Sequence, residues 1–568
     1  MAMRKYHLFN LSVVVCCFSL TISAQKQLSD SLIRAGVRLY DEGKYNEAIS
    51  MYRQVDENDS NYVWMLGELS MTFLQTQDYD SVIYYASAGL ENPSPYRQIL
   101  MRNMGTAYLA AGNREKSVEV YNDAIRLYPY SYLLHFNQGM TYMEMEDYRS
   151  AMNSLQEAIR CNPFHASSHM RLGMLMARQE QYSRALLSLE TFLALEPGTN
   201  RSNAVLVFIE NLSSGHLDTT YGDFIEPFAE NDMFEELDGL IKSRIALNKK
   251  YKGAIKFNAN LVKQTTLLME MLPTEDQAGD FWAETYLPFF RALKQGSFVE
   301  PFLYTILTSS GQEEVSQWIS KNKKSLESFY QTGRYLTSIR KSRLVTVDGK
   351  QQMLATSFDE NGNLSSLGNS NSSGAEHGFW QYYFPNGELK AEGSLSNGKK
   401  VGKWKYYTSD GLLESVENYT DGTINGEYLT YHPTGKLNIT GNFSNGMVDG
   451  KVIWRNIFGI PSRSLTFRND TLHGEARTYY DSSQLMEAYE NQNNQITGKH
   501  ITYYASGQER IIAYYNSGSL DGEYIEYHPN GRVSVRGTYK DGREEGEWTY
   551  WYSNGRVRLV SNYIDGVN

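Results

Sequence analysis

A glycine recurs every 24 residues through the last third of the chain, and this spacing limits the possible folds more than any other sequence feature. The eight positions follow one another without an insertion and are Gly378, Gly402, Gly426, Gly450, Gly474, Gly498, Gly522 and Gly546. Nine residues after seven of them stands a second glycine, which suits a turn that requires a positive φ. A tandem array of short units, each packed on the next, is therefore expected instead of one globular core.

The residues between these glycines predict β-hairpins. A further turn follows 20 residues after each leading glycine, in pairs such as Asn397-Gly398 and Asp421-Gly422, and short runs rich in Tyr, Trp, Val and Ile separate the turns. In Pro385-Asn386-Gly387 the proline favours a three-residue loop with glycine in the left-handed conformation. Residues 341–568 are thus predicted to form an irregular capping unit followed by eight hairpins.

The three-residue loop also predicts which face of the sheet is packed. It pairs the aromatic residue five places after the leading glycine with an apolar residue across the turn, as for Tyr407 and Leu413. We expect these side chains to share the packed face with Tyr419 and its equivalents. The tryptophans two places after leading glycines would then point outward or sideways, as candidates for stacking on glycans. They are Trp380, Trp404 and Trp548.

A different repeat, of 34 residues, fills the first third of the chain. Two independent markers share this spacing, and they are Gly105, Gly139 and Gly173, and Pro129, Pro163 and Pro197. Small residues allow paired helices to approach closely, and proline ends the second helix of a pair. Five helix pairs are predicted within residues 25–198. Residues 199–340 keep helical patterns without a period and are predicted to be an all-helical extension.

Both repeats resemble known families. Tyr108 and Tyr142, and Ala151 and Ala185, stand at the positions where the tetratricopeptide repeat family has them. The segments GFWQYYFPNGEL and GEWTYWYSNGRV resemble the MORN repeat in the variant form that some bacterial proteins carry in tandem. The resemblance implies a multidomain protein, first α and then β, with an α-solenoid of helix pairs followed by a hairpin platform for structural or binding roles.

In the tetratricopeptide family, fixed positions of the first helix of each pair face the concave side. Here they are rich in methionine, whose flexible side chain suits a surface that repacks against apolar ligands. This candidate protein-binding groove consists of Met71, Leu74, Arg102, Leu109, Phe136, Asn137, Met140, Met143, Met170, Arg171 and Met174. The alternatives are that the protein's own next helices cover the groove, or that the register is displaced by one residue.

Some members of this family instead clamp a peptide carboxylate. Arg102, Asn137 and Arg171 match three of the clamp positions, whereas Thr106 and Ser167 stand where asparagine and lysine are needed. With two of the five contacts missing, the sequence argues against this clamp.

The first 24 residues predict an export signal. Arg4 and Lys5 precede an apolar run, and Ala24 supplies a small residue for cleavage before Gln25. Cys16 and Cys17 lie inside the segment in a context that disfavours a lipoprotein anchor, which leaves Cys161 as the single cysteine of the mature chain. We therefore expect a soluble periplasmic or extracellular protein without a disulfide and without stable membrane insertion.

No catalytic, cofactor or metal constellation stands out. Cys161, His165 and His169 have four-residue spacing, but a proline turn separates the cysteine from the histidines. His432 and His528 recur beside hairpin turns, where packing explains them better than metal binding. A row of acidic residues follows leading glycines, either as solvated strand ends or as a weak cation site; it consists of Glu427, Glu475, Glu523 and Glu547.

The sequence therefore predicts a non-enzymatic, exported scaffold whose partners are other envelope or secreted proteins. A formal charge of −11 argues against nucleic acid as the main partner. The alternative function is glycan binding through the tryptophans. A further alternative, implied by the MORN resemblance, is an antitoxin-like or lipid-binding role.

Overall fold

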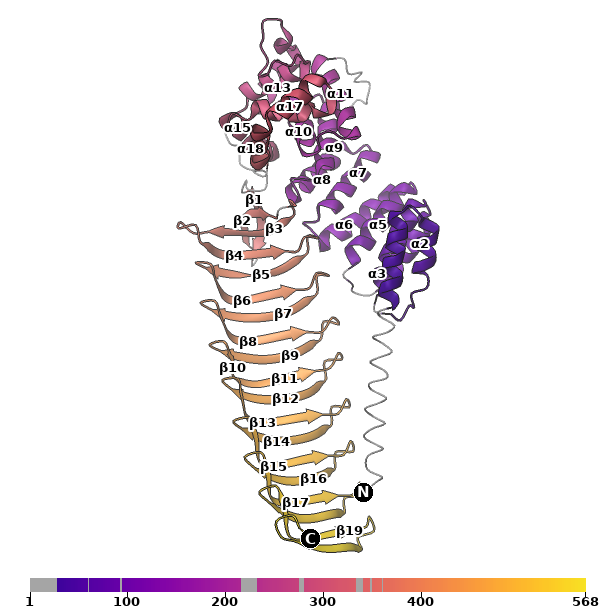
Figure 1. Ribbon diagram of the computed structural model, residues 1–568, viewed down its shortest axis with the longest axis vertical. Coiled ribbons are helices and arrows are strands. Elements are labelled where there is room, and N and C mark those ends of the chain that lie inside the picture. Colours follow the sequence, from indigo (N-terminus) through magenta and orange to yellow (C-terminus); the bar gives the residue numbers. More distant parts are fainter. Residues whose placement is uncertain are drawn as a thin grey trace. The chain divides into compact units, whose positions relative to one another are not determined.

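The computed structural model describes residues 28–59, 61–91, 94, 96–215, 232–274, 280–333, 341–347, 350–359 and 361–567 (Figure 1). The chain forms two compact units: Met1–Leu367 with Tyr383–Glu388, and Gly368–Tyr382 with Leu389–Asn568. The predicted export segment lies outside the described residues. Among the described helices, none combines the length and apolarity that a membrane crossing requires.

The first unit begins with paired helices, as the 34-residue period predicts (Figure 1). They are α2 (Tyr45–Tyr52), α3 (Tyr62–Gln75), α4 (Tyr79–Leu90), α5 (Arg97–Ala110), α6 (Arg114–Leu127), α7 (Tyr132–Glu144), α8 (Tyr148–Cys161), α9 (Ala166–Arg178) and α10 (Tyr182–Leu195). Glycine is required at the repeat positions because the paired helices pack closely. A Cβ on Gly105 would lie 2.7 Å from the ring of Tyr121, and one on Gly173 would lie 2.6 Å from Leu189.

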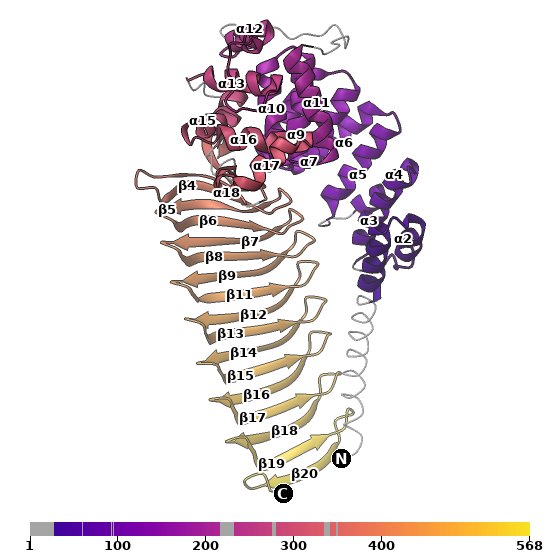
Figure 2. The same cartoon turned by 45° about the horizontal axis from the view of Figure 1, so that its top comes forward.

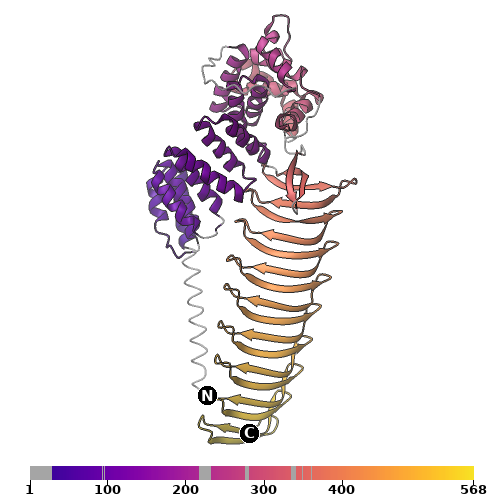
Figure 3. The ribbon, with the colours of Figure 1, turned by 180° about the vertical axis from the view of Figure 1, so that it is seen from behind.

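Further helices continue the first unit (Figure 3). They are α11 (Asn200–Ser214), α12 (Glu235–Ser243), η1 (Ile245–Leu247), α13 (Asn260–Glu270), α14 (Phe281–Thr285), α15 (Leu287–Gln295), α16 (Val299–Ile306), η2 (Leu307–Ser310), α17 (Glu313–Lys321) and α18 (Lys323–Gly333). Their apolar side chains join those of the last repeats in one buried cluster, which contains Leu189 and Phe192 of α10 together with Phe290 and Phe302. The last repeats and the helices that follow them therefore share one hydrophobic core.

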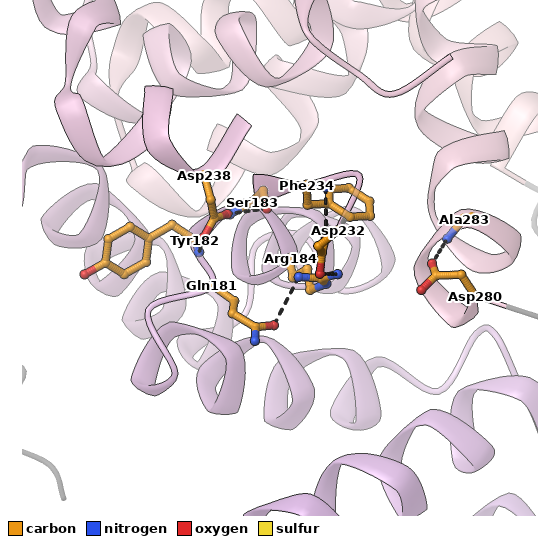
Figure 4. Close-up of polar contacts among 9 residues, drawn as sticks. All are labelled: Gln181, Tyr182, Ser183, Arg184, Asp232, Phe234, Asp238, Asp280 and Ala283. Atoms are coloured by element: carbon orange, nitrogen blue, oxygen red, sulfur yellow. Dashed lines mark hydrogen bonds and ion pairs between the residues drawn. The ribbon is translucent and has the colours of Figure 1, made fainter. Parts of the chain in front are cut away.

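Figure 4 shows how polar groups fasten α10 to the following helices. Asp238 accepts hydrogen bonds from the backbone N–H of Tyr182 (3.1 Å) and of Ser183 (2.7 Å), and so caps the N-terminus of α10. Arg184 donates to Asp232 at 2.7 Å, and the two side chains are only 7% and 8% exposed. A charge pair withdrawn from water in this way holds α10 in one position relative to the helices that follow.

Antiparallel strands account for the C-terminal part (Figure 2). They are β1 (Lys341–Val347), β2 (Lys350–Phe358), β3 (Leu364–Ser370), β4 (Glu376–Tyr383), β5 (Leu389–Ser396), β6 (Lys399–Tyr407), β7 (Leu413–Thr420), β8 (Thr423–Tyr431), β9 (Leu437–Ser444), β10 (Met447–Val448), β11 (Gly450–Arg455), β12 (Pro461–Arg468), β13 (Thr471–Tyr479), β14 (Leu485–Gln492), β15 (Gln495–Tyr503), β16 (Glu509–Asn516), β17 (Ser519–Tyr527), β18 (Val533–Lys540), β19 (Arg543–Trp551) and β20 (Val557–Tyr563). In the second unit each strand from β5 onward pairs with the next, except that β9 contacts both β10 and β11.

Both predicted turns are present. Gly411 has a φ of +77° and donates its N–H to Thr408, while Thr408 donates to Leu412, which confirms the three-residue loop. In the second turn Asn397 and Gly398 both have a positive φ, as a two-residue hairpin requires. Its Gly398 N–H reaches back to the carbonyl of Glu376 at 2.8 Å, and this bond recurs in the later repeats, so the turns connect neighbouring units.

The predicted assignment of faces is wrong, although the predicted pairing of Tyr407 with Leu413 is confirmed. A β-bulge between Tyr406 and Tyr407 adds a residue and reverses the alternation of the side chains beyond it. Tyr419 consequently shares a face with Trp404 and Tyr406, not with Tyr407. The ammonium group of Lys400, 5.0 Å from the ring centroids of Trp404 and Tyr419, lies on this same face.

Candidate functional site

The predicted groove residues all lie on the first helices of successive repeats. Met71 and Leu74 belong to α3, Arg102 and Leu109 to α5, and Phe136, Asn137, Met140 and Met143 to α7, with Met170, Arg171 and Met174 on α9. Helix α3 packs against α5, and α5 packs against α7, so their side chains form one continuous surface within the first unit. Most of these residues are half-buried, which leaves part of each side chain accessible.

The C-terminal end of this surface is occupied by the protein itself. Met170 is 7% exposed and lies in the buried cluster that also contains Trp282 and Tyr286 of the following helices. His169 bonds through Nδ1 to the hydroxyl of Tyr286 at 2.8 Å and through Nε2 to the carbonyl of Pro163 at 2.9 Å. Accessible groove surface is therefore concentrated on α3, α5 and α7.

The two residues that depart from the carboxylate clamp have other partners. Thr106 Oγ1 lies 2.8 Å from the hydroxyl of Tyr121, and Ser167 accepts a hydrogen bond from Arg201 at 2.9 Å. Arg171 is exposed on α9. Arg102, in contrast, is one of the residues that line a cavity.

That cavity has a volume of ≈ 450 Å³ and lies within the first unit. Its walls carry three tyrosines together with Ile99, and Arg102 contributes the positive charge. The complete lining is Tyr96, Gln98, Ile99, Arg102, Tyr130, Ser131, Tyr132, Leu133, Cys161, Asn363, Leu364, Pro385, Asn386 and Gly387. Pockets of this size accept a small molecule or one to two residues of a peptide.

The histidines singled out in the sequence make structural hydrogen bonds. His165 Nδ1 lies 2.8 Å from Ser168 Oγ, and burial lowers the pKa of His165 to about 4, so this imidazole is neutral near pH 7. His432 and His528 bond at 2.9 and 3.0 Å to the carbonyls of Arg455 and Trp551 in the next repeat. In the described part of the chain, no group of three or more His, Cys, Asp or Glu residues could hold a metal ion.

Basic side chains accompany two members of the acidic row. Glu475 lies 3.9 Å from Lys451 and contacts Arg477, and Glu523 accepts a hydrogen bond from Arg536 at 3.0 Å. Arg536 lies on the strand next to that of Glu523, whereas Arg477 shares strand β13 with Glu475 and Lys451 lies on β11. Ion pairs within the sheet therefore explain these two carboxylates without a bound cation.

The three candidate glycan-binding tryptophans do not face outward. Trp380, Trp404 and Trp548 are 5%, 1% and 2% exposed, so the expectation of free stacking surfaces is wrong. Each indole lies against a glycine of a neighbouring strand, where a Cβ would come within 2.4 Å of the ring or closer, at Gly368, Gly393 and Gly537. Because glycine has no side chain, each of these positions leaves space that an indole ring occupies.

Sequence reasoning missed a buried carboxyl group. Glu190 of α10 is 0% exposed; Thr265 donates to one of its oxygens at 2.6 Å, and the other oxygen has no hydrogen-bond partner among the described residues. Burial raises the pKa of Glu190 from 4.5 to about 8. In the sequence, Glu190 is the one acidic residue in the apolar run of α10. This pattern indicates a buried carboxyl group, but it does not predict that Thr265 bonds to it.

Comparison with protein families identifies both repeats. Tetratricopeptide repeat models match residues 103–131 and 136–198. A MORN repeat variant model matches residues 376–397, 424–445, 520–541 and 544–565. The chain thus carries tetratricopeptide repeats followed by MORN-variant repeats, as the sequence resemblance implied.

Several solved structures are similar over part of the chain. MamA from Desulfovibrio magneticus RS-1 has 16% identity and a TM-score of 0.26, over 30% of this chain and 94% of its own. A thermophilic TPR protein of Thermus thermophilus has 19% identity and a TM-score of 0.28, over 32% and 98%. PilF of Pseudomonas aeruginosa has 17% identity and a TM-score of 0.30, over 34% and 86%. No curated protein sequence matches the chain.

Proposed function

We propose that this protein is a non-enzymatic scaffold that holds a segment of a partner protein against the accessible groove on α3, α5 and α7. Tetratricopeptide and MORN repeats support a protein-interaction role in general. The observation that carries the specific proposal is the half-exposure of Met71, Leu109 and Met140, which lie on the first helices of three successive repeats; α3 packs against α5, and α5 against α7. Burying one such side chain against a partner contributes about 1.5 to 3 kcal/mol.

The proposal also places the protein and its partners outside the cytoplasm. The support is the N-terminal pattern of a basic start, a short apolar run and a small-residue cleavage site. Envelope or secreted proteins are accordingly the partners that we expect to reach the groove.

The groove is tested with a charge placed at its centre and a matched charge outside it. Met140→Lys introduces an ammonium group into the half-buried middle of α7, where an apolar partner would have to desolvate it. Met145→Lys makes the same change at the end of the same helix, where the side chain is 36% exposed. Proteins recovered with the wild-type chain from envelope extracts are quantified by mass spectrometry, and the main one is purified and titrated against both variants.

We expect Met140→Lys to weaken binding of the purified partner at least tenfold, and Met145→Lys to leave it within about twofold. The groove proposal is wrong if both variants bind the partner as the wild type does.

A further inference from the structure

Two hairpins of the second unit carry the same three aromatic residues on one face. Each set consists of a tryptophan and a tyrosine two places apart on one strand and a tyrosine on the next strand: the first trio is Trp404, Tyr406 and Tyr419 on β6 and β7, and the last trio is Trp548, Tyr550 and Tyr563 on β19 and β20. The strands pair in the same register, because the glycine two residues before the tryptophan lies opposite the second tyrosine in both hairpins. The two trios are therefore structurally equivalent.

The first trio holds an ammonium group of the chain itself. Lys400 Nζ lies 5.0 Å from the ring centroids of Trp404 and Tyr419. It lies 4.9 Å from the ring centroid of Tyr406, to whose hydroxyl it donates a hydrogen bond at 2.5 Å. The negative faces of aromatic rings attract a cation within about 6 Å of their centroids. This arrangement of rings thus accommodates a primary ammonium group.

The last trio has the opposite charge beside it. Glu544 stands where the first trio has Lys400, two residues before the glycine. The ring centroid of Trp548 lies 6.5 Å from that of Tyr550 and 6.4 Å from that of Tyr563. The pKa of Tyr550 is raised to about 12, chiefly by burial and then by the phenol of Tyr563 and the carboxylate of Glu544. No described cation is among the groups that act on Tyr550, so these rings and the carboxylate together favour a positive ligand.

Two further tyrosines enlarge the aromatic wall of the last trio. Tyr539 lies opposite Glu544 on the neighbouring strand, and its ring centroid is 5.0 Å from that of Trp548. The ring centroid of Tyr524 is 5.7 Å from that of Trp548, which is 2% exposed. The two tyrosines of the trio and Glu544 are half-buried, so a ligand would approach along these accessible side chains.

We propose that the last trio, together with Glu544, binds the ammonium group of a lysine side chain of a partner protein. The rings attract the cation, and the carboxylate accepts a charge-assisted hydrogen bond from it. A primary ammonium suits the site better than a quaternary one, because Lys400 uses an N–H group to bond to a phenol of the equivalent trio. The inference goes beyond the proposed function, since the site lies on β19 and β20 and its test needs no protein that binds the groove.

The test uses the full chain with 15N-labelled tryptophan, in which each indole N–H gives its own NMR resonance. The Trp548 and Trp404 resonances are assigned with Trp548→Phe and Trp404→Phe. The probes are a capped five-residue peptide with lysine between pairs of glycines, and the same peptide with acetyl-lysine or trimethyl-lysine in the central place. Circular dichroism and thermal unfolding check that every variant folds.

We expect the lysine peptide to shift the Trp548 resonance and to bind at least tenfold more tightly than the acetyl-lysine peptide. Glu544→Lys should abolish this binding, because the new side chain would occupy the trio as Lys400 does. Glu544→Gln, which adds no cation, should weaken it at least threefold. Glu547→Lys is the matched control: it makes the same charge change on the other face of β19 and should leave binding within about twofold.

Lys400→Glu should turn the first trio into a second site, so that the lysine peptide shifts the Trp404 resonance as well. An unchanged Trp404 resonance in this variant would contradict the equivalence of the trios. Equal binding of the lysine and acetyl-lysine peptides, no binding of either, or lysine binding that survives Glu544→Lys overturns the proposal. Tighter binding of the trimethyl-lysine peptide would assign the site to a quaternary ammonium and refute lysine as its ligand.

Discussion

Glu190 shows how the environment of one residue sets a property of the whole first unit. Its carboxyl group is fully buried on α10, and Thr265 is the described group that donates to it. Because burial favours the neutral form, Glu190 keeps its proton in the folded state well above the pH at which an unfolded chain releases it. Its effect on stability must therefore depend on pH.

The pKa of Glu190, about 8 when folded and 4.5 when exposed, predicts the direction of this dependence. Below the lower value both states are protonated, so the stability does not depend on pH through this residue. Between the two values the unfolded state binds fewer protons, so the free energy of unfolding falls as pH rises, by at most roughly 5 kcal/mol. Glu190→Gln should remove this fall, and its gain in thermal stability over the wild type should grow from pH 5 to pH 9.

Glu235→Gln is the matched control, because Glu235 is exposed on α12. It should shift the melting temperature by the same small amount at every pH between 5 and 9. A Glu190→Gln variant whose advantage stays constant over that range would show that the carboxyl is ionised in the folded protein.

Gly393 is a second residue whose contribution to stability depends on its surroundings, here the indole of Trp404. A Cβ there would lie 2.4 Å from the indole of Trp404, whereas the equivalent atom at Gly441, two repeats later, would meet only a methyl group of Val452 at 3.2 Å. We expect Gly393→Ala to destabilise the second unit by about 1 to 3 kcal/mol and Gly441→Ala to cost less. Denaturant unfolding followed by tryptophan fluorescence measures both, and equal effects would contradict the packing argument.

At the scale of elements, turn chemistry was predictable and face assignment was not. The residue types of Asn397-Gly398 and of the three-residue loop ending at Gly411 favour the positive φ angles that these turns adopt. The bulge between Tyr406 and Tyr407 has no such local signal, since it arises from pairing with Leu413 on the next strand. The register shift beyond the Tyr407–Leu413 pair exchanges the faces, so a prediction that continues the alternation from that pair places Trp404 on the wrong side.

The attachment of α10 to the following helices depends on a buried ion pair. Arg184 and Asp232 are nearly inaccessible, and the guanidinium also lies 4.8 Å from the ring centroid of Phe234. Arg184→Met leaves the carboxylate of Asp232 buried without its cation, at a cost of roughly 3 to 5 kcal/mol. Chemical unfolding monitored by circular dichroism at 222 nm measures this loss.

Arg126 supplies the comparison, because its pair with Asp123 is 76% and 52% exposed. Arg126→Met should change the free energy of unfolding by less than about 1 kcal/mol. Similar losses for Arg184→Met and Arg126→Met would mean that the Arg184 pair is as hydrated as a surface pair.

At the scale of the whole molecule, the two periods in the sequence predicted the order of architectures, α helices first and β-hairpins after them. They did so because each repeat packs mainly on its neighbours, so local residue patterns carry most of the information. The cavity beside Arg102 was not predictable, since its walls come from residues as far apart in sequence as Tyr96 and Pro385. The self-occupied end of the groove likewise depends on Tyr286, far from the repeat that it covers.

The proposed export concerns the whole chain, and it predicts where the mature protein begins. Cleavage after Ala24 would give a protein that begins at Gln25. Intact-mass measurement of the protein recovered from outside the cytoplasm should show the loss of the first 24 residues. Recovery of the full-length chain from the cytoplasm alone would contradict export.

The central claim, that the accessible groove on α3, α5 and α7 holds the partner, is tested most directly by hydrogen–deuterium exchange of the full chain with and without the purified partner. We predict that amide exchange slows on binding in α3, α5 and α7, and that Met140→Lys abolishes the slowing. Protection confined to the hairpins between β4 and β20, with these three helices unchanged, would contradict it.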